Sequence, residues 1–343
     1  MTDLPALPWQ ARQWDRLRAA LAADRLAHAL LLRGPRGVGK GVFARRLARL
    51  LLCEARPREN EACGRCRACA LTAAGTHPDW LTVSPEPDRA TIGIAQIRDL
   101  IEQLGLTAHH GGYKVVLVDP AQACTREAAN TLLKTLEEPP GAVVFLLVAH
   151  QAALLPATVR SRCQSVTFPV PDRAEALTWL ARAVPDVEPA AAEAALDLAG
   201  GAPLDAVVLC APEARARIDA LTEDLRALLV RQRSAVDVAG GWQALGAVQT
   251  TERLTRVLQQ AARVLAGSAT PSGQNRDGQH AAASSAMQAL VAELDFERLF
   301  ELHDACRAAW RGCALRQGLN EQLLLEQLAV TCRESQSTRP AGR

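Results

Sequence analysis

A glycine-rich run at 34–41 has residues of the type and spacing that bind phosphate groups. Its sequence, Gly-Pro-Arg-Gly-Val-Gly-Lys-Gly, fits G-x-x-x-x-G-K-[ST] up to the last position, where Gly41 replaces a hydroxyl side chain. In such a P-loop, backbone N–H groups and the lysine hold the nucleotide phosphates, while the hydroxyl binds Mg²⁺. The run therefore predicts a nucleotide site that lacks its metal-binding hydroxyl, with a plain glycine turn as the alternative. The predicted phosphate-binding residues are Gly34, Gly37, Gly39 and Lys40.

A second part of the expected ATPase site is also incomplete. The strand predicted at 114–119 ends in Asp119, the acidic residue that would face the metal, but Pro120 follows where a catalytic glutamate is expected. A missing general base alone typically costs roughly 10²–10⁴-fold in rate. With hydroxyl and base both absent, the sequence predicts no effective intrinsic hydrolysis. The retained Lys40 leaves ATP binding open.

Four of the ten cysteines lie within 53–69, in the pattern Cys53-x9-Cys63-x2-Cys66-x2-Cys69. Four thiolates suit a tetrahedral Zn²⁺ site, and a full set of protein ligands leaves no open position for catalysis. The pattern therefore predicts a structural zinc module. The alternatives are unrelated free cysteines or a redox pair, and a redox pair leaves two of the four cysteines unexplained.

The third candidate is Arg162, in the turn at 161–163 before the strand predicted at 165–168. An isolated arginine in a loop is most often a solvated surface residue. In a P-loop domain that cannot hydrolyse its own nucleotide, however, an arginine at the end of the sheet could reach the γ-phosphate held by a neighbouring subunit. An arginine finger supplied in trans is worth roughly 10³–10⁵-fold in rate.

An α/β domain followed by helices is expected to position these residues. Short apolar runs alternate with helical patterns to about residue 170, as in a parallel sheet covered by helices, and only helical patterns follow. A helix at 42–52 follows the glycine loop, and another at 125–138 begins at the N-cap Thr125. The expected strands are 28–32, 80–84, 114–119, 142–148 and 165–168.

Length and composition indicate the general class of protein. A length of 343 residues predicts two or three globular domains. A net charge of +2 argues against a strongly basic chain that binds nucleic acid through its overall charge. The sequence contains no apolar signal region near its start and no run of about 18 apolar residues. We therefore expect a cytoplasmic protein without membrane contact.

Several segments resemble the clamp-loader subunits of bacterial DNA polymerase III. They are the run Asn-Thr-Leu-Leu-Lys-Thr-Leu-Glu-Glu-Pro-Pro at 130–140, the Ser-Arg-Cys turn at 161–163 and the four-cysteine cluster. Shorter matches at 74–79 and 111–114 precede two of the expected strands. The resemblance is specific over about residues 26–170 and only architectural beyond them.

Within this family, the chain resembles a non-hydrolysing subunit and not the tau/gamma motor. Besides Gly41 and Pro120, the sensor-1 region Val148-Ala149-His150 lacks the threonine usual in motors. Leu204 stands where the motors carry an arginine. The residues that depart from the pattern of an active ATPase therefore lie in four separate motifs.

The resemblance implies a fold of the α/β plus all-α class with three domains. The first is a RecA-like AAA+ P-loop domain at 1–170, which contains a zinc module at 53–69. The second is a helical lid at 171–210, and the third is a helical collar for oligomerisation at 211–333. A disordered tail at 334–343 is expected to follow.

The resemblance also implies partners and an activity. The partners are the tau/gamma motor and delta subunits in a five-subunit ring, with the sliding clamp and primer–template DNA reached through the complex. Such a subunit helps to load the clamp onto primed DNA during replication, as part of the DNA polymerase III holoenzyme. Arg162 would be its arginine finger in trans.

Two other functions fit parts of the sequence. An ATP-hydrolysing tau/gamma-type motor would require the damaged motifs to work, and an ATPase rate that depends on Lys40 would reveal it. A zinc-dependent DNA-binding regulator is disfavoured, because no helix with basic and aromatic residues accompanies the cysteine cluster.

Overall fold

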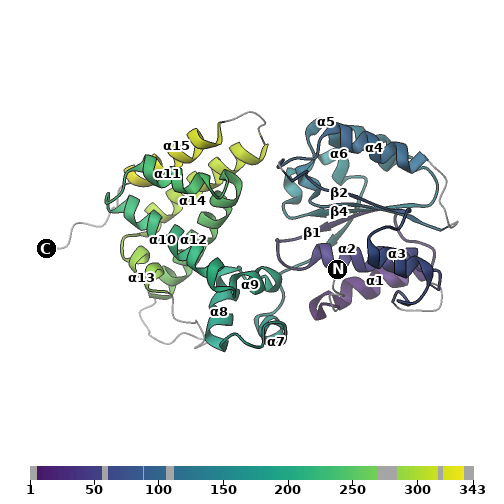
Figure 1. Ribbon diagram of the computed structural model, residues 1–343, viewed down its shortest axis with the longest axis horizontal. Coiled ribbons are helices and arrows are strands. Elements are labelled where there is room, and N and C mark those ends of the chain that lie inside the picture. Colours follow the sequence, from purple (N-terminus) through teal and green to yellow (C-terminus); the bar gives the residue numbers. More distant parts are fainter. Residues whose placement is uncertain are drawn as a thin grey trace. The chain divides into compact units, whose positions relative to one another are not determined.

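The computed structural model describes residues 6–55, 61–87, 89–105, 112–268, 284–315 and 320–335. The chain forms two compact units, Met1–Glu175 and Ala176–Arg343, which Figure 1 shows as an α/β unit and a helical unit. This division confirms the predicted α/β plus all-α class. Residues 336–343 of the predicted tail lie outside the described residues.

The α/β unit is built on a five-stranded parallel sheet in the order β2-β3-β4-β1-β5. Each strand lies close to its expected range. The strands are β1 (Ala29–Arg33), β2 (Trp80–Val83), β3 (Lys114–Val118), β4 (Val143–Ala149) and β5 (Gln164–Thr167).

Helices cover both faces of this sheet (Figure 1). On one face lie α4 (Ile94–Gly105) and α5 (Arg126–Glu137), and on the other lie α1 (Ala11–Ala22), α2 (Lys40–Leu52) and α3 (Arg67–Ala74). All residues of β3 and β4 are buried, which explains their continuous runs of apolar side chains.

Helix α5 forms as the sequence predicts. The hydroxyl of its N-cap Thr125 accepts a hydrogen bond from the N–H of Ala128, and Glu127 lies in the first turn, where the helix dipole favours negative charge. Its buried side chains, including Leu132 and Leu136, join the core cluster that contains Phe145 of β4. This packing fixes the end of α5 against the sheet.

Parallel strands place the candidate residues at two different edges of the sheet. The P-loop follows β1 and Asp119 follows β3, so both lie at the carboxyl edge. Arg162 precedes β5, and the register sets Gln164 beside Leu30 at the start of β1. Arg162 therefore lies at the opposite, amino edge.

The second unit contains only helices among its described residues. After α7 (Arg173–Ala183), which spans the boundary between the units, the helices are α8 (Pro189–Leu198), α9 (Pro203–Leu209), α10 (Pro212–Leu229), α11 (Ala235–Gln243), α12 (Ala247–Ser268), α13 (Ser285–Ala292), α14 (Phe296–Leu315) and α15 (Glu321–Glu334). The finer division into a lid at 171–210 and a collar at 211–333 stays a prediction. In the part of the chain that the structure describes, no helix is both long and apolar enough to cross a membrane.

Candidate functional site

The glycine loop lies between β1 and α2, in the order expected of a P-loop. Gly37 and Gly39 have φ angles of +77° and +90°, and Gly39 is the N-cap of α2. Gly34 has a φ of +154°, and a Cβ added there would lie 2.1 Å from the carbonyl oxygen of Phe168. The backbone therefore requires glycine at these positions, for conformation and, at Gly34, also for space.

Lys40 turns into the loop itself. Its side chain is 2% exposed, and Nζ donates hydrogen bonds to the carbonyl oxygens of Gly34, at 2.7 Å, and Pro35. The lysine thus stabilises the loop conformation directly, which gives it a structural reason to be retained beside a degenerate site. The sequence left the retention of Lys40 unexplained.

The N-terminal segment η1 (Pro8–Gln10) also holds the loop. The side-chain nitrogens of Trp9 and Gln10 both donate to the carbonyl oxygen of Val38, each at 3.0 Å. Sequence reasoning missed these two residues, because nothing in their local pattern indicates a contact with a segment 28 or 29 residues away.

Asp119 and Arg45 converge on Gly41. A Cβ built on Gly41 would lie 2.9 Å from Oδ2 of Asp119 and 3.4 Å from Nη1 of Arg45. The carboxylate therefore occupies the space next to the position where a P-loop hydroxyl would stand, and a guanidinium lies beside it. The loop and its cations suit phosphate, whereas the site lacks the hydroxyl that a P-loop offers to Mg²⁺.

Burial raises the pKa of Asp119 above its ordinary value, and the cations of Arg45, Lys40 and Arg36 oppose this shift. Sequence reasoning missed Arg45, although its position in the predicted helix could have indicated it. Arg45 lies four residues after Gly41, and residues at that spacing share a helix face.

The Asp119→Asn variant is expected to be more stable than the natural chain at neutral pH, because a partly buried carboxylate is costly when charged. The folded-state pKa lies above the unfolded value of about 3.9, so this cost is present above the folded pKa and vanishes below the unfolded one. Urea unfolding at about pH 7 and about pH 4 checks this, and the advantage of the variant should shrink in acid. A less stable variant at neutral pH would show that the cations outweigh burial.

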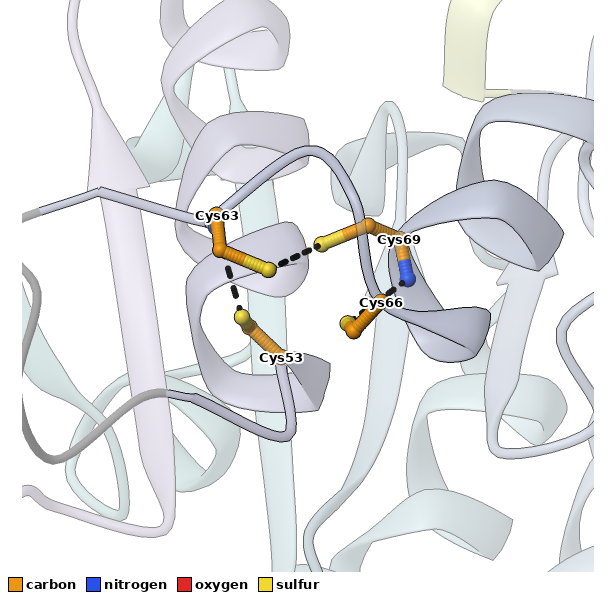
Figure 2. A group of neighbouring side chains, drawn as sticks. All are labelled: Cys53, Cys63, Cys66 and Cys69. Carbon is orange, nitrogen blue, oxygen red and sulfur yellow. Dashed lines mark hydrogen bonds between the residues drawn. The ribbon is translucent and has the colours of Figure 1, made fainter.

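The four clustered cysteines come together between α2 and α3 (Figure 2). Cys53 is the C-cap of α2, Cys66 is the N-cap of α3, and Cys69 lies in the first part of α3. All four Sγ atoms lie within 4.8 Å of one another, and those of Cys63 and Cys69 are 3.9 Å apart. Tetrahedral Zn²⁺ with bonds of about 2.3 Å requires sulfur–sulfur distances of about 3.8 Å. The cluster could therefore hold a metal ion.

Backbone N–H groups stabilise the thiolate forms that metals bind. The N–H of Cys63 donates to Sγ of Cys53 at 3.3 Å, and the N–H of Cys69 donates to Sγ of Cys66 at 3.4 Å. The N–H groups of Arg65 and Cys66 lower the pKa of Cys63 to about 6. Burial raises the pKa of Cys53 and Cys69, which makes these two thiols costly to ionise without a cation.

Arg162 lies in the turn between α6 (Ala157–Arg160) and β5. Its Nε donates to Oε1 of Glu137 at 2.5 Å, its Nη2 pairs with the same oxygen, and its Nη1 donates to the carbonyl oxygen of Thr158 at 2.9 Å. Glu137 is the last residue of α5. Sequence reasoning missed Glu137 as a partner, although it lies in the 130–140 run that carries the resemblance.

The structure brings the predicted residues into three groups. The P-loop glycines, Lys40 and Asp119 gather at the carboxyl edge of the sheet. The four cysteines form a cluster of their own, and Arg162 lies at the amino edge with Glu137. Arg162 therefore does not complete the P-loop of its own chain.

Comparisons with known proteins find matches among the subunits of DNA polymerase III. A family model described as "DNA polymerase III, delta subunit" matches residues 9–172. DNA polymerase III subunit delta' of Pseudomonas aeruginosa is 44% identical over 238 residues, which cover 69% of this chain and 71% of that protein. Subunit delta' of Escherichia coli is 42% identical over 202 residues, 59% of this chain and 60% of the relative. DNA polymerase III subunit tau of Bacillus subtilis is 34% identical over 152 residues, 44% of this chain and 26% of that protein.

Proposed function

This chain belongs to the family of DNA polymerase III delta' subunits, and from this we propose that it is a clamp-loader subunit that does not hydrolyse ATP itself. It supplies Arg162 in trans to an adjacent ATPase subunit. In this role it helps to place the sliding clamp on primed DNA during replication.

The position of Arg162 is the observation that carries this proposal. Because Arg162 and the P-loop lie at opposite edges of one parallel sheet, the arginine does not serve a nucleotide at Lys40 of the same chain. A partly exposed arginine at that edge would be available to a nucleotide on the next subunit of a ring, which supports the proposal. An arginine finger in trans is worth roughly 10³–10⁵-fold in hydrolysis.

The degenerate P-loop supports the lack of intrinsic turnover. Gly41 supplies no hydroxyl, Pro120 supplies no base, and the carboxylate of Asp119 lies against Gly41 beside a guanidinium. The loop remains a well-formed phosphate-type turn, held by Lys40, so weak nucleotide binding is compatible with its shape.

We further propose that the ion held by Cys53, Cys63, Cys66 and Cys69 is Zn²⁺. Four sulfur ligands within 4.8 Å of one another suit zinc, and a four-sulfur site leaves no coordination position for a substrate. The ion would join the end of α2 to the start of α3, and its role would be structural.

The proposed partners are the delta subunit and the tau/gamma motor, in a five-subunit ring within the cytoplasm. The names of the relatives support membership of this assembly. Contact with the sliding clamp and with primer–template DNA would come through the complex, since a net charge of +2 provides no general attraction for DNA.

Reconstitution tests the proposal. The purified chain, mixed with the delta and tau/gamma subunits of its own organism, should co-elute with them as one assembly in size-exclusion chromatography. The chain alone should show no ATP hydrolysis above a buffer control. Turnover by the isolated chain that Lys40→Ala abolishes, in a variant that still unfolds cooperatively, would instead identify an ATPase motor. Failure to co-elute would contradict the clamp-loader role.

A further inference from the structure

We infer that Glu137 is a positioning residue that holds the guanidinium of Arg162 in the orientation in which it meets the phosphate of a neighbouring subunit. This inference rests on the proposed function, because it concerns how the arginine finger is prepared for its role. It assigns a task to a carboxylate that contacts no P-loop residue and no cysteine of the cluster among the described residues.

The hydrogen bonds of Arg162 hold all three nitrogens of its guanidinium. Glu137 receives the N–H of Nε and one N–H of Nη2, and the carbonyl oxygen of Thr158 receives one N–H of Nη1. A guanidinium has five N–H donors. Nη1 also donates to Oγ of Ser161 at 3.5 Å, the longest of these hydrogen bonds, so one N–H of Nη2 has no acceptor among the described residues and the second N–H of Nη1 has only this weak one. A phosphate that displaces the Ser161 contact would find one N–H on each terminal nitrogen, and such a pair binds two phosphate oxygens at once.

The two anchors of the guanidinium come from well-packed elements. Next to Glu137, Leu136 is buried in the core, and its carbonyl oxygen accepts a hydrogen bond from Nε2 of His28 at 2.8 Å. Next to Thr158, the side chain of Val159 is buried. Helix α5 and the turn of α6 are therefore fixed to the sheet, and the arginine is held from two sides.

A held arginine is more effective than a mobile one. A long arginine side chain in solvent samples many rotamers, and ordering it in the transition state costs conformational entropy. Anchors that already restrict its rotamers remove part of this cost before the phosphate arrives, and a misplaced catalytic group loses rate steeply. Glu137 is therefore expected to act on the rate of hydrolysis through Arg162.

The same pair contributes little to folding. The side chains of Arg162 and Glu137 are 34% and 47% exposed, and ion pairs with this exposure are weakened by solvent. Loss of Glu137 should therefore leave the fold and the assembly intact. This separation makes the inference testable, because an effect on hydrolysis would not come from unfolding.

Glu138 offers a matched control. It follows Glu137 directly, it is exposed, and its side chain has no ion pair or hydrogen bond to any other described residue. Replacing either glutamate with glutamine removes one negative charge from the same end of α5 and keeps the shape of the side chain. Only Glu137→Gln removes the charge that pairs with Arg162.

The experiment measures kcat and KM for ATP in the reconstituted loader with clamp and primed DNA. Under conditions in which Arg162→Ala lowers hydrolysis, Glu137→Gln is expected to lower kcat at the served site about tenfold with little change in KM. Glu138→Gln should leave both values unchanged. In the Arg162→Ala background, Glu137→Gln should cause no further loss, because its effect passes through the arginine.

Three results would overturn the inference. They are an unchanged or raised kcat in Glu137→Gln, an equal loss in Glu138→Gln, and additive losses in the double variant. A raised kcat would mean that the carboxylate restrains the finger. If Arg162→Ala itself leaves hydrolysis unchanged, the proposed trans finger fails, and Glu137 has no finger to position. If Arg162→Ala lowers hydrolysis but Glu137→Gln does not, the trans finger stands and the positioning role of Glu137 fails.

Discussion

Arg162→Ala in the reconstituted loader is expected to lower the rate of ATP hydrolysis at the one site that the arginine serves, by roughly 10³-fold. The physical reason is the loss of a cation that neutralises charge developing on the transferred phosphoryl group in the transition state. Total steady-state hydrolysis should fall by the share of that site, while motor sites elsewhere in the ring keep their own rates. Single-turnover measurements with clamp and primed DNA separate the affected site from the others.

Assembly and folding should survive the change. The side chain of Arg162 is one-third exposed and makes only surface contacts, so its removal is expected to change the free energy of unfolding by about 1 kcal/mol or less. The matched control is Arg160→Ala, which removes an exposed arginine at the end of α6, two residues before Arg162, and should leave hydrolysis unchanged. Equal hydrolysis by Arg162→Ala and the natural chain, in a loader that still assembles, would remove the trans finger from this protein.

Purified chain is expected to carry one tightly bound zinc ion, and Cys63→Ser or Cys66→Ser should abolish it. Each change removes one of four soft ligands and leaves three thiols, two of which are buried, around a cation that prefers a complete sulfur set. Structural zinc sites in small peptides have apparent binding free energies of about 10–16 kcal/mol at neutral pH, so the loss should be large. Elemental analysis of the protein after gel filtration gives the metal content directly.

The zinc variants should lose structure mainly between α2 and α3. Cys53 is buried where α2 ends and Cys69 is buried in the first turn of α3, so an ion bound to both would tie these two segments together. Cys210→Ser, a change in the helical unit far along the chain from the cluster, is the control and should keep a full complement of zinc. Metal-free natural protein, or zinc retained in Cys63→Ser, would contradict the assignment.

Local sequence patterns were sufficient to predict most of the helices and strands of the α/β unit. The five strands follow continuous or alternating apolar runs, and α5 follows a capping threonine and a spaced row of leucines, so neighbours in the sequence decide these elements. The P-loop and the cysteine cluster are likewise short motifs whose spacing restricts their geometry. These features were predictable because the interactions that produce them lie within a few residues or within one supersecondary unit.

Other contacts at the site were beyond local reasoning. Arg45 and Asp119 meet at Gly41 although they lie in different halves of the α/β unit. Trp9 and Gln10 hold Val38 only because the chain brings η1 against the loop. The spacing of residues on one helix could have indicated Arg45, but no pattern indicates which side chains meet across separate elements.

By itself, the sequence determined the parallel α/β class, the incomplete P-loop, the four-cysteine pattern and the presence of a candidate finger, because residue type and spacing define each of them. Only the tertiary structure decided that Lys40 bonds its own loop, that the four thiols converge and that Glu137 holds Arg162. It also separated Arg162 from its own P-loop, since strand direction and order place them at opposite edges of the sheet. Such relations depend on how distant segments pack, which the order of residues along the chain does not state.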